Sequence, residues 1–282
     1  MCKRRAPGNK FFSSIILRIF LHLNVTVKDY FSRQAGEYLR FRPVYPAAVF
    51  DYIVSLAASH NLAWDAGTGN GQVAVELAGR FAQVYATDIS ENQLKHAIAR
   101  ENIIYKIENA SQCSLPDDSF DLVTVSQAIH WFDFETFYSE VKRTLKAEGA
   151  IAVIGYGLFR MNKKVDAVID HFYETILSGF WNDERRYLDE SYRTIPFPFD
   201  EITPPAFAIE YYWGVEQVMG YLRSWSAVNN YLNTRKEDPV QLISNDLKSV
   251  FAASAGNEPT GDVNVKLKAI IPVFMRVGRN KK

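Results

Sequence analysis

The first half of the chain alternates short continuous apolar runs with segments whose apolar residues recur at helical spacing. The apolar runs predict five strands, at residues 62–66, 84–87, 103–107, 120–125 and 150–156. The helical segments predict helices at residues 47–60 and 72–79, one opening at the Ser90–Gln93 capping box, and one from Phe134 to a stop at Gly149. Strands that alternate with helices in this way favour a parallel sheet covered on both faces.

The second half of the chain has a different pattern. Helical spacing predicts three helices, at residues 165–176, 215–225 and 242–253. Alternating apolar residues predict two further strands, at residues 207–212 and 263–277, the second disturbed at Pro272. The pattern as a whole predicts an α/β fold: a seven-stranded, mostly parallel sheet with helices on both faces and a helical cap.

The N-terminal segment is separate from this pattern. Several basic residues precede an apolar run at 11–23, an arrangement like that of a signal peptide. Polar residues interrupt the run, no small-residue cleavage site follows, and the run is too short to span a bilayer. We therefore expect residues 1–26 to be a dispensable extension, with a membrane-surface anchor through residues 3–23 as the alternative. One domain is expected to cover residues 27–282.

Charge and cysteine content narrow the functional classes. The 32 basic residues balance the 32 acidic ones, which argues against a strongly basic nucleic-acid binder. Two cysteines form no disulfide framework, so a cytoplasmic location is expected. The five histidines are scattered without metal-ligand spacing, and no metal site is expected.

A glycine-rich turn follows the first strand. The sequence from Asp65 to Gly71 reads Asp-Ala-Gly-Thr-Gly-Asn-Gly, and a helix is predicted directly after it. A strand, a glycine turn and a helix form a nucleotide-binding crevice in Rossmann-like folds. A dinucleotide fingerprint would need a third glycine where Gln72 stands. The Asp65 carboxylate would repel a pyrophosphate but attract an ammonium group, which favours S-adenosylmethionine as the ligand.

An acidic residue ends the second predicted strand. Asp88 lies 19 residues after Gly69, where nucleotide-binding Rossmann folds use a carboxylate to accept hydrogen bonds from ribose hydroxyls. Alternatively, Asp88 only precedes the helix that Ser90 caps. The next residue, Ile89, is expected to pack on an adenine face.

Several motifs together resemble those of class I S-adenosylmethionine-dependent methyltransferases. They are the turn from Asp65 to Gly71, Asp88, and the sequence Leu-Pro-Asp-Asp-Ser-Phe-Asp-Leu-Val at residues 115–123. Residues 127–133, Gln-Ala-Ile-His-Trp-Phe-Asp, resemble the trans-aconitate methyltransferase-like branch, as do residues 42–46, 145–149 and 225–227. The resemblance covers roughly residues 28–279.

The resemblance implies S-adenosylmethionine as cofactor and a set of residues that bind it. Tyr38 and Arg42 would close over the cofactor, with Arg42 pairing its methionine carboxylate; alternatively Arg42 binds a substrate carboxylate or faces solvent. Gln127 would lie at the methionine end, and Ala110-Ser111 stands where the family often has an acidic residue beside adenine. The expected cofactor-binding residues are Tyr38, Arg42, Asp65, Gly67, Thr68, Gly69, Asp88, Ile89, Ala110, Ser111, Gln127 and Trp131.

No catalytic residue stands out, because in-line methyl transfer depends mainly on holding the reactants in place. His130 is the candidate general base, and its alternative is a packing histidine beside the cofactor. Trp131 would lie against the sulfonium of the cofactor, with cation–π attraction between them, or it would belong to the hydrophobic core. An acceptor pocket is expected with His130 and Trp131 on its floor. Its walls are expected to include Tyr156, Trp181, Trp225 and Tyr231, and the alternative for these four aromatic residues is a place in the core. Three cap segments, at about residues 27–46, 157–205 and 214–255, are expected to meet above the glycine turn.

These features predict a small-molecule methyltransferase that O-methylates a carboxylate or a hydroxyl group. One alternative is an NAD-dependent oxidoreductase, which the missing third glycine and Asp65 disfavour. Another is a non-catalytic S-adenosylmethionine-binding protein. The expected partner is a small methyl acceptor, with neither nucleic acid nor membrane involved.

Overall fold

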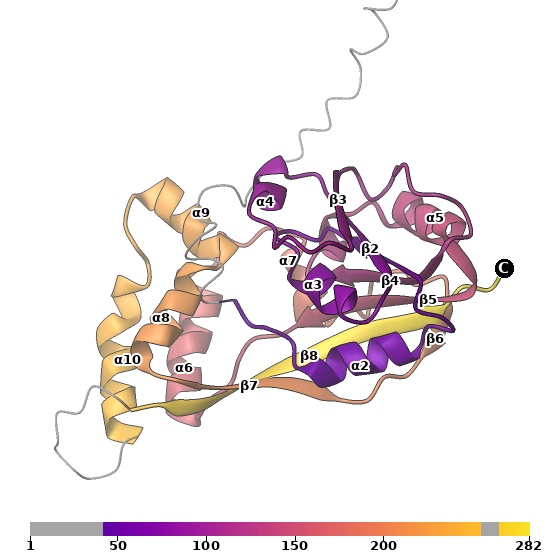
Figure 1. The fold of residues 1–282 in the computed structure, drawn as a ribbon. Coiled ribbons are helices and arrows are strands. Elements are labelled where there is room, and N and C mark those ends of the chain that lie inside the picture. The colour runs from indigo at the N-terminus through magenta and orange to yellow at the C-terminus, as the bar shows by residue number, and fades with distance from the viewer. Residues whose placement is uncertain (1–41, 255–264) are drawn as a thin grey trace, which may run out of the picture. The chain divides into compact units, whose positions relative to one another are not determined.

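The computed structural model describes residues 42–254 and 265–282, and in this part eight strands form one sheet. Their order is β3-β2-β1-β4-β5-β8-β6, and β7 also pairs with β8 (Figure 1). The strands are β1 (Leu62–Ala66), β2 (Gln83–Asp88), β3 (Ile103–Ile107), β4 (Phe120–Ser126), β5 (Leu145–Tyr156), β6 (Asp200–Ile202), β7 (Phe207–Trp213) and β8 (Leu267–Arg279).

The mostly parallel Rossmann-like sheet is confirmed, with one more strand than predicted. Strands β1 to β5 pair in parallel, and β8 runs antiparallel to β5. The other edge of β8 is shared, because β6 pairs with its last three residues and β7 with Leu267–Val273. The extra strand β6 has only three residues in a proline-rich stretch, so no apolar alternation marks it. Strand β8 runs through Pro272, where a disturbance was expected.

The helices lie largely where their periodicity predicts. They are α2 (Ala47–Ser55), α3 (Gln72–Ala78), α4 (Glu91–Lys95), η2 (Ile129–Trp131), α5 (Phe134–Thr144), α6 (Lys163–His171), the π-helix η3 (Phe172–Ile176), α7 (Arg185–Asp189), α8 (Val215–Arg223), α9 (Ser226–Arg235) and α10 (Gln241–Ser254). Helices α7 and α9 and the short helix η2 were not predicted. The segment expected to be one helix to residue 225 ends at Arg223, and α9 begins at Ser226.

Two predicted helix ends are wrong. Helix α2 ends at Ser55 rather than at residue 60, five residues short of the expected limit. Helix α5 ends at Thr144 rather than near Gly149, because Leu145 already pairs with Phe120 as the first residue of β5. The register shift that follows and the left-handed backbone of Glu148 (φ 59°) make residues 145–149 a bulged strand segment rather than a helix stop.

Alternate residues of the strands face two separate cores, as expected for a sheet covered on both faces. Ala63 and Leu122 belong to a core that includes α2, α3, α6, α8, α9 and α10. Trp64 and Val123 belong to a second core, which includes α5. Figure 1 shows α6, α8, α9 and α10 gathered at one end of the sheet, beside the far ends of β7 and β8.

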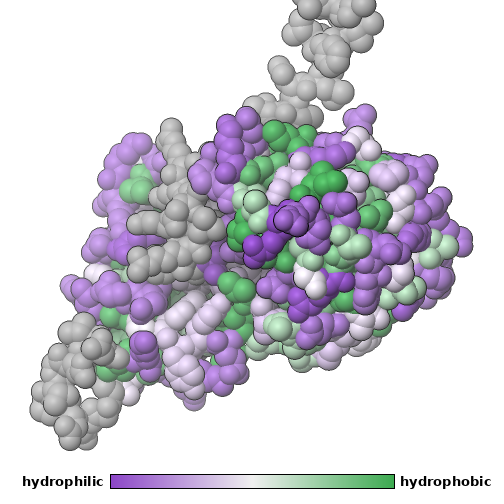
Figure 2. All heavy atoms as spheres, in the orientation of Figure 1, coloured by the Kyte–Doolittle hydropathy of each residue, from purple (hydrophilic) through white to green (hydrophobic). Residues whose placement is uncertain are grey.

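The surface drawn in Figure 2 is largely hydrophilic, and its hydrophobic residues form small separate groups. Large exposed apolar side chains in the described ranges include Ile89, Trp131 and Tyr212. None of the helices described is long and apolar enough to cross a membrane.

Candidate active site

The turn from β1 to α3 depends on its glycines. Gly67, Gly69 and Gly71 have positive φ angles of 65°, 57° and 83°, a left-handed backbone that favours glycine. A Cβ atom on Gly67 would lie 2.7 Å from the Cβ of Ala128. The turn therefore passes directly against the segment that follows β4.

Asp65 lies beneath this turn with its side chain buried. One carboxylate oxygen accepts a hydrogen bond from Thr68 Oγ1 at 2.5 Å, and the other accepts from Thr124 Oγ1 at 2.7 Å. Burial raises the pKa of the Asp65 carboxyl group to about 6, although the two hydroxyl donors lower it. These contacts fix the conformation of the turn, and the expected attraction of Asp65 to a ligand ammonium group stays a prediction.

Asp88 links the glycine turn to the next helix. Its Oδ2 accepts from the backbone N–H of Gly69 and its Oδ1 from that of Ser90, both at 2.8 Å. These two bonds hold the carboxylate at the carboxyl end of β2, beside the residue that caps α4. The neighbouring Ile89 side chain is 49% exposed, as an apolar surface for an adenine ring would have to be.

The other residues that were predicted to lie beside the adenine ring are in the loop after β3. Ala110 is buried, and the Ser111 backbone N–H donates to Asn109 Oδ1 at 2.9 Å. Trp131 is 37% exposed, and its ring centroid lies 4.9 Å from that of His130. Tyr38 lies outside the described residues.

His130 is buried and held by a residue distant in sequence. Its Nδ1 lies 3.1 Å from the hydroxyl of Tyr192, which is fully buried. Burial, together with the positive charges of Arg185 and Arg42, lowers the pKa of His130 to about 3. The imidazole is therefore neutral at neutral pH and a weak proton acceptor.

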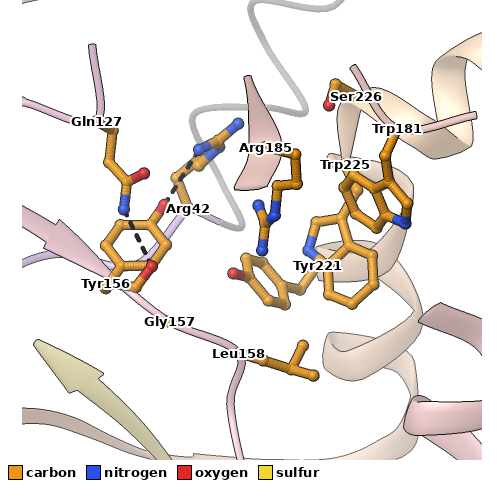
Figure 3. A pocket seen from close by; sticks show the side chains of 10 residues that line it. All are labelled: Arg42, Gln127, Tyr156, Gly157, Leu158, Trp181, Arg185, Tyr221, Trp225 and Ser226. Carbon is orange, nitrogen blue, oxygen red and sulfur yellow. Dashed lines mark hydrogen bonds between the residues drawn. The ribbon is translucent and has the colours of Figure 1, made fainter. Parts of the chain in front are cut away.

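A pocket lies where β5 ends and the cap helices begin (Figure 3). Tyr156, Trp181 and Trp225 line it, as predicted, whereas Tyr231 packs against Phe180 with 4.7 Å between ring centroids. His130 and Trp131 are also not among the lining residues. The pocket is lined by Arg42, Gln127, Tyr156, Gly157, Leu158, Trp181, Arg185, Tyr221, Trp225 and Ser226.

The pocket adjoins the glycine turn. Gln127 lines the pocket, and the residue after it, Ala128, is the one that Gly67 approaches. Arg42 also lines the pocket rather than facing only solvent, and its Nη1 donates to the hydroxyl of Tyr156 at 3.1 Å. A ligand in the glycine crevice and a second ligand in the pocket would therefore be neighbours.

Sequence analysis missed Arg185 and Tyr221 as pocket residues. Arg185 lies on α7, a five-residue helix that is too short to show a periodic apolar pattern. Tyr221 lies on α8 with other apolar residues at helical spacing, which is a pattern typical of core residues. Only the tertiary packing, in which α7 contacts η2 and α8 contacts β7, brings these two side chains to the same pocket.

The residues around the turn fit S-adenosylmethionine. A Cβ atom on Gly69 would meet nothing closer than 4.0 Å, so the backbone there borders open space that a ligand could enter. Asp88 would hold the ribose hydroxyls, and the absence of a third fingerprint glycine at Gln72 is no obstacle for a cofactor without a pyrophosphate.

Comparisons with known proteins agree with this site. A sequence model described as a methyltransferase domain matches residues 64–153. A protein of Dictyostelium discoideum that carries a methyltransferase name is 31% identical over 261 residues, which are 90% of this chain and 95% of that protein. A protein of Mycobacterium tuberculosis, also named as a methyltransferase, is 33% identical over 44% of this chain and 51% of its own length.

A solved structure gives the same result. A protein of Anaeromyxobacter dehalogenans, whose name places it among type II methyltransferases, is 34% identical to this chain. Its structure superposes with a TM-score of 0.77 over 86% of this chain and 99% of its own. This similarity over nearly the whole chain, together with the glycine turn and its acidic partner Asp88, shows that the chain belongs to the S-adenosylmethionine-dependent class I methyltransferases.

Proposed function

We propose that the chain transfers the methyl group of S-adenosylmethionine to a small molecule, with O-methylation of a carboxylate or hydroxyl group as the reaction. The observation that carries this proposal is the pocket that adjoins the glycine turn through Gln127 and Ala128. Trp181, Tyr221 and Trp225 line it with aromatic side chains, and concave sites of this kind are where proteins bind small molecules.

The residues of the site bind and orient the reactants. When bound, S-adenosylmethionine supplies a methyl group activated by its sulfonium. Asp88 holds the ribose, and the glycines allow close approach of the backbone of the turn. Arg42 fixes the Tyr156 hydroxyl at the border between crevice and pocket. Enclosing the acceptor between cap and sheet excludes water and fixes the in-line geometry, which accounts for much of the rate of such reactions.

His130 serves in this proposal as a positioning residue. Its bond to Tyr192 ties the segment after β4 to the segment after α7. A carboxylate acceptor needs no general base, because it is already ionised at neutral pH. A hydroxyl acceptor would lose its proton elsewhere than to His130, whose pKa of about 3 makes it a poor base.

An acceptor screen tests the proposal. Release of S-adenosylhomocysteine is measured with a panel of small carboxylic acids and hydroxyl compounds. We expect turnover with at least one of them, and we expect Trp225→Ala to reduce it. Tyr231→Ala, on the helix α9 that Trp225 directly precedes but outside the pocket, is the matched control and should keep the wild-type rate. Turnover with protein or RNA alone, and with no member of the panel, would contradict the proposal.

A further inference from the structure

We propose that Arg185 selects the methyl acceptor by its charge. The Arg185 guanidinium binds an anionic group of the acceptor, either a carboxylate or a phosphate. The apolar body of the acceptor lies against the aromatic side chains that line the pocket. This inference rests on the proposed function, because it assigns the acceptor to the pocket of Figure 3.

Arg185 is held from one edge. Its Nε donates to the hydroxyl of Tyr173 at 2.9 Å and to Asp189 Oδ1 at 3.2 Å. Its Cζ lies 4.8 Å from the ring centroid of Trp181 and 5.4 Å from that of Tyr173, within the range of cation–π attraction. The side chain is thus fixed without using the outer ends of the guanidinium.

Those outer ends are available to a ligand. Within the described part of the chain, every hydrogen bond that Arg185 donates comes from Nε, and none from its two terminal nitrogens. Figure 3 shows the guanidinium pointing into the pocket toward Tyr221, between the Arg42–Tyr156 pair and Trp225. Two parallel N–H donors in this position match the two oxygens of a carboxylate or phosphate.

The fold holds the supports of Arg185 in place. Tyr173 belongs to the π-helix η3, and such segments occur frequently at functional sites. The segment after α7 is anchored by Tyr192, which is fully buried, has a left-handed backbone (φ 59°) and contacts His130. A residue held in this way loses little freedom when it binds a ligand.

The charge and the walls of the pocket define the ligand. Among the described lining residues two are arginines, Arg42 and Arg185, and none is acidic. Asp189 accepts its hydrogen bond from Nε, and no described residue accepts one from the two terminal nitrogens of Arg185. Trp181, Tyr221 and Trp225 offer flat apolar surfaces beside this positive charge. The pocket therefore suits a small organic anion with a planar or apolar body.

Three probes of similar size test this. Benzoate, phenyl phosphate and the uncharged benzamide are titrated into the protein saturated with S-adenosylhomocysteine, and tryptophan fluorescence reports binding beside Trp181 and Trp225. We expect at least one of the two anions to bind about tenfold or more tightly than benzamide. Comparing benzoate with phenyl phosphate distinguishes a carboxylate from a phosphate ligand.

Variants assign the effect to Arg185. Arg185→Gln should remove the preference for the anion, and Arg185→Lys should retain part of it. The matched control is Arg186→Gln, which alters the adjacent exposed arginine that contacts Tyr187. The melting temperature and S-adenosylhomocysteine affinity of each variant show whether it folds.

The outcomes separate this inference from the proposed function. Equal binding of the anions and benzamide, no binding of either anion at millimolar concentration, or an anion preference that survives in Arg185→Gln would overturn the role of Arg185. If S-adenosylhomocysteine still binds, none of these results contradicts the proposed methyltransferase activity. Failure of the wild-type protein to bind S-adenosylhomocysteine would instead contradict the proposed function itself.

Discussion

Asp88 places one carboxylate between the glycine turn and the helix that follows β2. We expect Asp88→Asn to weaken S-adenosylmethionine binding about tenfold or more, because hydrogen bonds to a charged acceptor contribute about 1.5–3 kcal/mol each. Calorimetry on the purified variant measures this. Glu91→Gln, an exposed change on α4 that removes the same charge, is the control and should bind like the wild type. An unchanged dissociation constant for Asp88→Asn would exclude the ribose role.

Asp65 predicts a pH dependence of stability. The pKa of its buried carboxyl group is raised from 3.8 to about 6, so the folded chain holds this proton more tightly than the unfolded chain. The resulting stabilisation is fully present below about pH 4 and is lost as the pH rises through about 6. Two pKa units correspond to roughly 3 kcal/mol.

Urea unfolding of the wild type and of Asp65→Asn measures this effect. The difference in unfolding free energy between them should shift in favour of the wild type as the pH falls from 7 to 4, because the variant has no proton to gain at this position. A difference that stays constant over this range would show that the carboxyl group titrates normally.

His130 should remain neutral through the physiological range. Its burial beside two arginines gives it a pKa of about 3. We therefore expect its imidazole signals in nuclear magnetic resonance spectra to stay constant between pH 5 and pH 8. His130→Asn identifies the signals by their loss. A titration midpoint near 6.5 would instead make His130 available as a general base.

At the scale of elements, the β1–α3 turn depends on the left-handed backbone of its glycines and on the absence of side-chain atoms where it passes a neighbouring segment. Gly67 and Gly179 both have positive φ angles, of 65° and 79°, but only Gly67 has a neighbour where a Cβ atom would lie. Alanine at either position costs about 1–2 kcal/mol in backbone strain. Gly67→Ala should cost more, because its methyl group would also collide with Ala128.

The pair of variants separates the two effects. Gly179→Ala should lower the free energy of unfolding modestly and leave cofactor binding unchanged, whereas Gly67→Ala should lower both. Urea unfolding and calorimetry measure them. Equal losses in the two variants would mean that the turn can move away from Ala128.

At the scale of the whole molecule, the described residues of the glycine turn and of the pocket lining lie between Arg42 and Ser226. We predict that a chain beginning at Val27 keeps the melting temperature and S-adenosylmethionine affinity of the full chain, because every sequence motif of the site follows this position. Thermal unfolding and calorimetry compare the two proteins. A lower melting temperature or precipitation of the shorter chain would show that residues 1–26 contribute to the fold.

The sequence alone determined the features that depend on local rules. The glycine turn, the end of β2 at Asp88 and the cap at Ser90 follow from backbone sterics and from hydrogen bonds between near neighbours, as Ser90 Oγ with the N–H of Gln93 illustrates. The parallel strands follow from short apolar runs between helices. These signals predicted the fold class and a nucleotide-like ligand, and the resemblance of the motifs to those of class I methyltransferases added the methyltransferase activity.

The tertiary structure alone decided the contacts between distant residues. The bond between His130 and Tyr192 spans 62 positions, and the bond between Arg42 and Tyr156 spans 114. Arg185 reaches the pocket from a helix with no periodic pattern, and β6 forms because the long strand β8 offers an edge to pair with. Such contacts depend on how whole elements pack, and local periodicity reports only which face of an element is buried, not which partner covers it.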